Sequence, residues 1–264
     1  MNAEAWQLSK TNEKEINKTE IRCWKRLFNL PVTTPNVAVV YSFGTLYASI
    51  QVDIKQMIYL HRILSREPNH WTRRIFSTLE NLNVGWYAQI KKKLQDYELE
   101  TDMEKIKTKT RPEWKCEVHN AAEKMNSKKL QEDCYETTPD GKKVKSKTAH
   151  VLEKITECNY QRKVMHPATF MSQIEVKALI LSRFRMLECG KNFRGKYPET
   201  CSECDVLDDE DHRLNNCSRF KMTNLCNSIE KVVFSDVFSE DVETVKATLK
   251  AIMKVWNVRN GGMY

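Results

Sequence analysis

Apolar residues recur every three or four positions along most of the chain, which is the spacing of one face of an α-helix. Pro31 and Pro35 interrupt the pattern, and a new helix is expected to start near Asn36. Residues 98–111 mix charges without an apolar period and are expected to be a linker or an exposed helix. The pattern predicts helices at residues 19–29, 47–64, 71–82, 86–97, 112–131, 146–158, 174–189 and 242–256.

Turn signals are few. The stretch 138–141 reads Thr-Pro-Asp-Gly, which is typical of a type I turn, and it lies in a Lys-rich loop. Only 7 of the 264 residues are glycine, and a β-sandwich, a barrel or a Gly-looped nucleotide fold normally needs more turn glycines. The apolar share of 41% still supports a hydrophobic core.

The sequence contains no apolar run of about 18 residues, so a membrane-spanning helix is not expected. The first 18 residues are polar and do not resemble a signal peptide, and they are expected to form a polar N-terminal tail. The cysteine count, nine, is odd, which disfavours a fully disulfide-paired secreted scaffold. An intracellular protein, nuclear or cytoplasmic, without a membrane partner or a small-molecule substrate, is therefore expected.

Three cysteines and one histidine, residue types that ligate metals, are gathered in the string CSECDVLDDEDHRLNNC at positions 201–217. Their spacing is Cys-x2-Cys-x7-His-x4-Cys, and three thiolates with one imidazole suit a closed tetrahedral Zn²⁺ site. Because a complete ligand set leaves no open position, the zinc is expected to be structural and to order a polar loop. The alternative is a set of free cysteines beside an ordinary loop histidine. The expected zinc ligands are Cys201, Cys204, His212 and Cys217.

The sequence therefore predicts a mainly α protein, an irregular multi-helix assembly with a small CCHC zinc knuckle near the C-terminus. Any strands are expected to be short and confined to the knuckle. The expected segments are a tail at 1–18, a helical region at 19–97, a basic helical region at 98–195, the knuckle at 196–222 and C-terminal helices at 223–264.

Charge changes sharply beside the knuckle. Residues 159–197 hold eight basic and two acidic residues, a net charge of +6, whereas residues 198–217 have a net charge of −6. Basic groups for phosphate and rings for base stacking are the pair expected at a nucleic-acid surface. The alternative is that the two aromatic residues near the knuckle, Tyr197 and Phe220, only pack it onto a helix. The candidate nucleic-acid-binding residues are Arg183, Arg185, Lys191, Arg194, Lys196, Tyr197 and Phe220.

Catalytic motifs are absent from the sequence: it contains no P-loop, GxGxxG, HExxH or GxSxG. Paired aspartates can hold catalytic Mg²⁺, but Asp208 and Asp209 lie between two zinc ligands and are expected to belong to a solvated acidic loop. His61 lies on an apolar helical face and is expected to be a core histidine with its hydrogen bonds satisfied.

Two stretches together resemble a known family. Residues 19–65 contain LPVTTPN, followed by a long predicted helix with YLHR near its end. Residues 184–220 contain the knuckle, with a Glu-Asp pair directly before its histidine. This order is similar to the region downstream of the palm and thumb in non-LTR (LINE-type) retrotransposon reverse transcriptases. The resemblance implies that the region helps to hold RNA or DNA near a reverse transcriptase core.

The chain departs from that family in its catalytic part. The aromatic-x-Asp-Asp motif of the polymerase is absent, and no palm or endonuclease domain fits before Thr19. The chain is therefore expected to correspond to the C-terminal part of such a protein, as a truncated copy or a stand-alone derivative, without polymerase activity of its own. The first hypothesis is a nucleic-acid-binding module. The second is a protein-interaction or purely structural domain. The third is an enzyme, because the family that the chain resembles consists of RNA-directed DNA polymerases.

Overall fold

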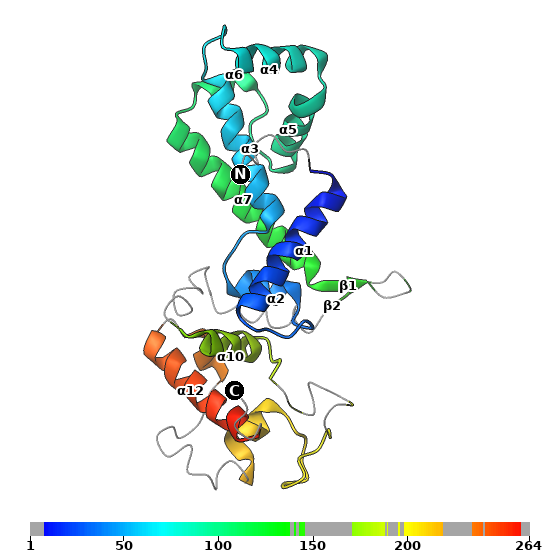
Figure 1. Ribbon diagram of the computed structural model, residues 1–264, viewed down its shortest axis with the longest axis vertical. Coiled ribbons are helices and arrows are strands. Elements are labelled where there is room, and N and C mark those ends of the chain that lie inside the picture. The colour runs from blue at the N-terminus through cyan, green and yellow to red at the C-terminus, as the bar shows by residue number, and fades with distance from the viewer. Residues whose placement is uncertain are drawn as a thin grey trace. The chain divides into compact units, whose positions relative to one another are not determined.

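The computed structural model is mainly helical, which confirms the predicted fold class (Figure 1). It describes residues 8–137, 140, 143–145, 171–187, 189, 195, 198–218, 234–239 and 241–259. The α-helices are α1 Lys10–Leu27, α2 Asn36–Ser42, α3 Ala48–Leu64, α4 Trp71–Leu82, α5 Gly85–Asp96, α6 Met103–Thr108, α7 Arg111–Asp133, α10 Gln173–Arg183 and α12 Val242–Arg259. The shorter elements are β1 Tyr135–Thr137, β2 Lys143–Lys145, the π-helical turn η2 His212–Asn216 and the 3-10 helix η3 Phe234–Phe238.

The chain divides into two compact units. The first unit comprises Met1–Arg22 and Leu46–Asp133, and the second comprises Cys23–Thr45 and Cys134–Tyr264. The predicted boundary at residues 97 and 98 is therefore wrong: it falls inside the first unit, where α3 packs against helices on both sides of it.

Helix α3 is the centre of the first unit. It packs against α7 over much of its length and also contacts α4, α5 and α6 (Figure 1). Its apolar stripe includes Met57 and Leu60, both fully buried. Trp114 of α7 is 1% exposed, and its indole N–H donates to the carbonyl oxygen of Met57 at 2.9 Å. A buried indole with its donor satisfied is a strong anchor between two helices.

The segment 98–111, expected to be a linker or an exposed helix, contains the short helix α6. Most residues of α6 are exposed, as the second alternative predicted, but Met103 and Ile106 are buried. His61 is a satisfied core histidine, as predicted: it is buried and its Nε2 lies 2.9 Å from the carbonyl oxygen of Lys109. Two apolar side chains and one histidine bond therefore hold this charged stretch in place.

A buried polar cluster joins α3 to the end of α5. The Asp53 carboxylate pairs with the ammonium of Lys93 and accepts a hydrogen bond from the Tyr97 hydroxyl at 2.8 Å. Burial and the neighbouring Asp53 carboxylate both raise the pKa of Tyr97 far above its ordinary value. The first unit therefore holds this phenol in its neutral form.

The pH dependence of unfolding tests this cluster. Because the pKa of Tyr97 is higher in the folded chain than the unfolded value of about 10, its contribution is fully present below about pH 10 and is lost as the pH rises further. We expect the free energy of unfolding in urea to fall more steeply above about pH 10 for the wild type than for Tyr97→Phe. Parallel declines for the two proteins would contradict the assignment.

The second unit is built on α10 and α12. Helix α10 begins with a capping box in which the Ser172 hydroxyl and the Glu175 carboxylate satisfy each other's backbone N–H groups. Val245, Leu249 and Ile252 of α12 are buried on the face that the sequence pattern indicated, and they join a core that also contains Cys217. The segment 201–217, which carries the four predicted metal ligands, therefore packs on this unit's hydrophobic core.

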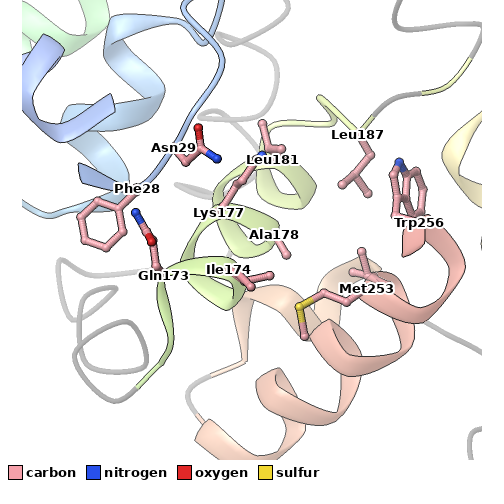
Figure 2. A pocket seen from close by; sticks show the side chains of 11 residues that line it. Phe28, Asn29, Gln173, Ile174, Lys177, Ala178, Leu181, Leu187, Met253 and Trp256 are labelled. Carbon is pink, nitrogen blue, oxygen red and sulfur yellow. The ribbon is translucent and has the colours of Figure 1, made fainter. Parts of the chain in front are cut away.

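A small groove lies beside that core. Figure 2 shows Ile174 of α10 and Met253 of α12 along it, with Phe28 and Trp256 at its two sides. Its volume of about 100 Å³ is below the roughly 300–1,000 Å³ of typical ligand pockets. The groove is therefore a packing feature of the second unit rather than a small-molecule site.

Three further sequence-based expectations were wrong. The predicted tail at 1–18 is helical from Lys10, where Asn17 is buried and accepts a hydrogen bond from the backbone N–H of Ser49. Strands are not confined to the knuckle, because β1 and β2 pair antiparallel around the predicted turn. The helix expected over 174–189 ends at Arg183. The helix expected over 146–158 lies outside the described residues.

Candidate metal centre

The first two cysteines of the knuckle lie in a tight turn. Thr200 and Leu207 form an isolated antiparallel bridge, which folds the chain back on itself between them. Inside this hairpin the backbone N–H of Cys201 donates to Val206, and that of Asp205 donates to Cys201, at 2.8 and 2.9 Å. Asp205 adopts a left-handed conformation with φ 53°. This hairpin brings the thiols of Cys201 and Cys204 close together, as the x2 spacing predicted.

The other two ligands come from one wide helical turn. The π-helical turn η2 begins at His212, whose backbone N–H is capped by the Asp209 carboxylate at 2.8 Å. The backbone N–H of Cys217 donates to the carbonyl oxygen of His212 at 2.7 Å, closing a ring over five residues. This widened turn brings the imidazole and the thiol to one side of the loop.

All four predicted ligands converge. Their side-chain donor atoms lie within 4.8 Å of one another, and the Sγ atom of Cys217 lies 3.8 Å from that of Cys201 and 4.0 Å from that of Cys204. The Nε2 atom of His212 is buried and has no hydrogen-bond partner within the described part of the chain. A buried nitrogen of this kind is costly unless it is bound. The arrangement can therefore hold a metal ion.

The thiol of Cys204 is placed to ionise. The Ser218 hydroxyl lies 3.2 Å from its sulfur, and hydrogen bonds from this hydroxyl and from the Ser218 backbone lower the pKa of Cys204. Since the thiolate is the ligating form, this environment favours metal binding.

The acidic residues of the loop are not all solvated, which corrects the sequence-based expectation for Asp208. Its carboxylate is 5% exposed and forms a two-pronged ion pair with the guanidinium of Arg213, which is 3% exposed. Glu210 is also buried and accepts a hydrogen bond from the backbone N–H of Leu187 at 3.1 Å. These residues brace the loop, a role that the sequence reasoning missed. The spacing of Asp208 and Arg213 across the metal-ligand histidine was the signal available.

The candidate nucleic-acid-binding residues have different fates. Arg183 was expected to contact phosphate, but it is only 1% exposed and its Nε donates to the carbonyl oxygen of Val237 at 2.9 Å. It is therefore not available to nucleic acid. Arg185 takes the left-handed position after α10, with φ 51°, and its guanidinium pairs with Glu210 and Asp211 at 3.1 and 3.5 Å. The remaining candidates lie outside the described residues: Lys191, Arg194, Lys196, Tyr197 and Phe220.

Comparison with known proteins identifies no relative: no family model, no curated protein and no solved structure matches the chain. Within the described ranges, none of the helices has both the length and the apolar character needed to cross a bilayer.

Proposed function

We propose that the chain is a nucleic-acid-binding helical module, derived from the C-terminal part of a non-LTR retrotransposon reverse transcriptase and held by one structural zinc ion. The convergence of Cys201, Cys204, His212 and Cys217 carries this proposal, because the same four residues give the resemblance its knuckle. A transient partner in this role would be a reverse transcriptase core.

Zinc is the metal that the donor set favours. Three thiolates and one imidazole are a common closed tetrahedral set for structural zinc. With Cys201, Cys204 and Cys217 ionised, the complex carries a formal charge of −1, so it would not attract phosphate directly. When bound, the ion would tie the hairpin at 200–207 to the turn η2. Its contribution is therefore to fold the loop rather than to act on a substrate.

Polymerase activity is not part of this role. The string nearest to a polymerase motif is Val-Leu-Asp-Asp at 206–209, and it lies between two metal ligands. The carboxylate of Asp208 is buried and paired with Arg213, which supports a structural role for it rather than the holding of catalytic Mg²⁺.

Salt-dependent binding tests the nucleic-acid role. The chain has a net charge of +8, and we expect binding to single-stranded RNA and to duplex DNA with little sequence preference, since phosphate contacts position but do not specify. If three or more phosphates are contacted, affinity for RNA should fall by about tenfold or more between about 50 and 200 mM salt. Fluorescence anisotropy with labelled oligonucleotides measures this. An absence of salt-sensitive binding would overturn the nucleic-acid role.

A specific observation favours a second candidate, a zinc-stapled structural or protein-interaction domain. The charge contrast beside the knuckle is partly neutralised inside the chain, because Arg185 of the basic segment pairs with Glu210 and Asp211 of the acidic segment. If the purified protein contains zinc yet fails to bind nucleic acid at low salt, this second function takes the place of the first.

A further inference from the structure

The first unit contains a hollow with an unusual lining. It has a volume of about 610 Å³ and lies where the end of α3 meets the start of α7. Its wall carries three cations and a tyrosine, and no carboxylate lines it in the described part of the chain. The lining residues are Lys55, Ile58, Tyr59, His61, Arg62, Ser65 and Arg111.

Helical geometry brings the cations together. Lys55, Tyr59 and Arg62 lie four and three residues apart, so they share one face of α3. Arg111 is added by the first residue of α7, which α3 contacts. The bond from the buried His61 to the carbonyl oxygen of Lys109 fixes the two helix ends against each other. The three cationic side chains therefore come from a rigid frame.

The charges of these three cations are not balanced by ion pairs within the part of the chain that the structure describes. Lys55, Arg62 and Arg111 are exposed, and they form no ion pair with any residue that the structure describes. The neighbouring carboxylates have other partners: Glu113 accepts hydrogen bonds from Thr110, and Glu117 pairs with Lys109 at 2.5 Å. Three uncompensated charges around one hollow produce a positive field that attracts a polyanion.

The fourth component is aromatic. Tyr59 is partly exposed in the hollow, and its ring is supported from the side by Trp86 in an edge-to-face contact at 6.1 Å. A held ring beside several cations is the combination that single-stranded nucleic acids use, with stacking for the base and cations for the backbone.

We propose that this hollow, formed by Lys55, Tyr59, Arg62 and Arg111, is a phosphate-binding surface for single-stranded nucleic acid. It rests on the proposed nucleic-acid function, and it places binding on the first unit instead of on the flanks of the knuckle. The three cations neutralise backbone phosphates and Tyr59 stacks a base. The residues that line this surface all belong to the first unit, whereas the zinc-binding loop belongs to the second.

The test compares two triple variants of the full chain by anisotropy with a labelled oligouridylate of about 20 nucleotides, longer than typical binding sites. The hollow variant is Lys55→Gln, Arg62→Gln and Arg111→Gln. The matched control neutralises three exposed lysines outside the hollow: Lys92→Gln, Lys124→Gln and Lys128→Gln. We expect the hollow variant to bind roughly 10- to 100-fold more weakly than wild type near 100 mM salt, with a salt slope smaller by about two, and the control to change much less.

Tyr59 supplies an independent readout. Tyr59→Leu removes the ring and is expected to weaken binding by about fivefold or more, whereas Tyr59→Phe keeps the ring and should bind like wild type. Circular dichroism and thermal unfolding of all variants show whether the first unit is folded.

The outcomes separate this inference from the proposed function. If the wild-type chain does not bind oligouridylate, both fail. If it binds and the two triple variants weaken binding equally, the hollow is not the surface, while the proposed function stands. If a polyglutamate peptide binds the wild type as tightly and loses binding in the same variants, the hollow takes an acidic protein segment and the nucleic-acid assignment is overturned.

Discussion

Purified protein is expected to contain about one zinc ion per chain, and Cys217→Ser is expected to lose it together with the fold of the knuckle. Cys217 is 1% exposed, belongs to the core of the second unit and lies within 4.0 Å of the sulfur atoms of both other cysteines. The apparent binding free energy of a structural zinc is about 10–16 kcal/mol, so loss of one ligand has a large effect on folding. Elemental analysis and circular dichroism during thermal unfolding measure the two results.

The control for this experiment is Cys116→Ser. Cys116 is an exposed free cysteine on α7 of the first unit. Its replacement should leave both the zinc content and the thermal transition unchanged. A Cys217→Ser protein that retained wild-type zinc and melted like the wild type would show that these four residues do not form the metal site.

Asp208→Ala is expected to destabilise the second unit by about 3–5 kcal/mol, because it removes the carboxylate that forms a buried ion pair with the guanidinium of Arg213. The guanidinium of Arg213 also lies over the ring of Trp256, at 5.8 Å from its centre, so in the variant this charge would remain buried against the core. Urea unfolding monitored by circular dichroism gives the change in free energy.

A rescue variant isolates the charge effect. Replacing both partners, with Asp208→Leu and Arg213→Met, removes the ion pair without leaving a buried charge, and such replacements are often neutral or stabilising. Glu203→Gln, at an exposed position of the same loop, is the matched control. A loss for Asp208→Ala no larger than that of the Glu203 control would contradict a buried ion pair.

The metal-ligand set was predictable from the sequence because its information is local. Four ligands within 17 residues need only a turn and a short helix to meet, and the x2 and x4 spacings describe both. The long helices were equally accessible. The stripe on α12 that contains Val245, Leu249 and Ile252 could be predicted because helical geometry places apolar residues spaced by about 3.6 positions on one face. That face is the buried one.

What the sequence concealed depends on contacts between distant segments. Arg183 looked like a surface cation, but its bond to the carbonyl oxygen of Val237 joins residues 54 positions apart. Asn17 looked like part of a polar tail, but it pairs with Ser49 across 32 positions. Lys55, Arg62 and Arg111 form a group only because α3 meets the start of α7. Periodicity indicates which face of a helix is apolar, but not which polar residues tertiary packing brings together.

Glu210 links the metal-ligand loop to the end of α10. One of its oxygens accepts the backbone N–H of Leu187, the other pairs with Arg185, and Glu210 itself lies two residues before the ligand His212. Chelation of the metal or oxidation of its thiol ligands would release the loop. The backbone N–H of Leu187, which follows α10, would then lose its acceptor, the Glu210 carboxylate. The loop and this helix end should open together as one cooperative unit, so that amide hydrogen exchange at Leu187 follows metal occupancy although Leu187 is not a ligand.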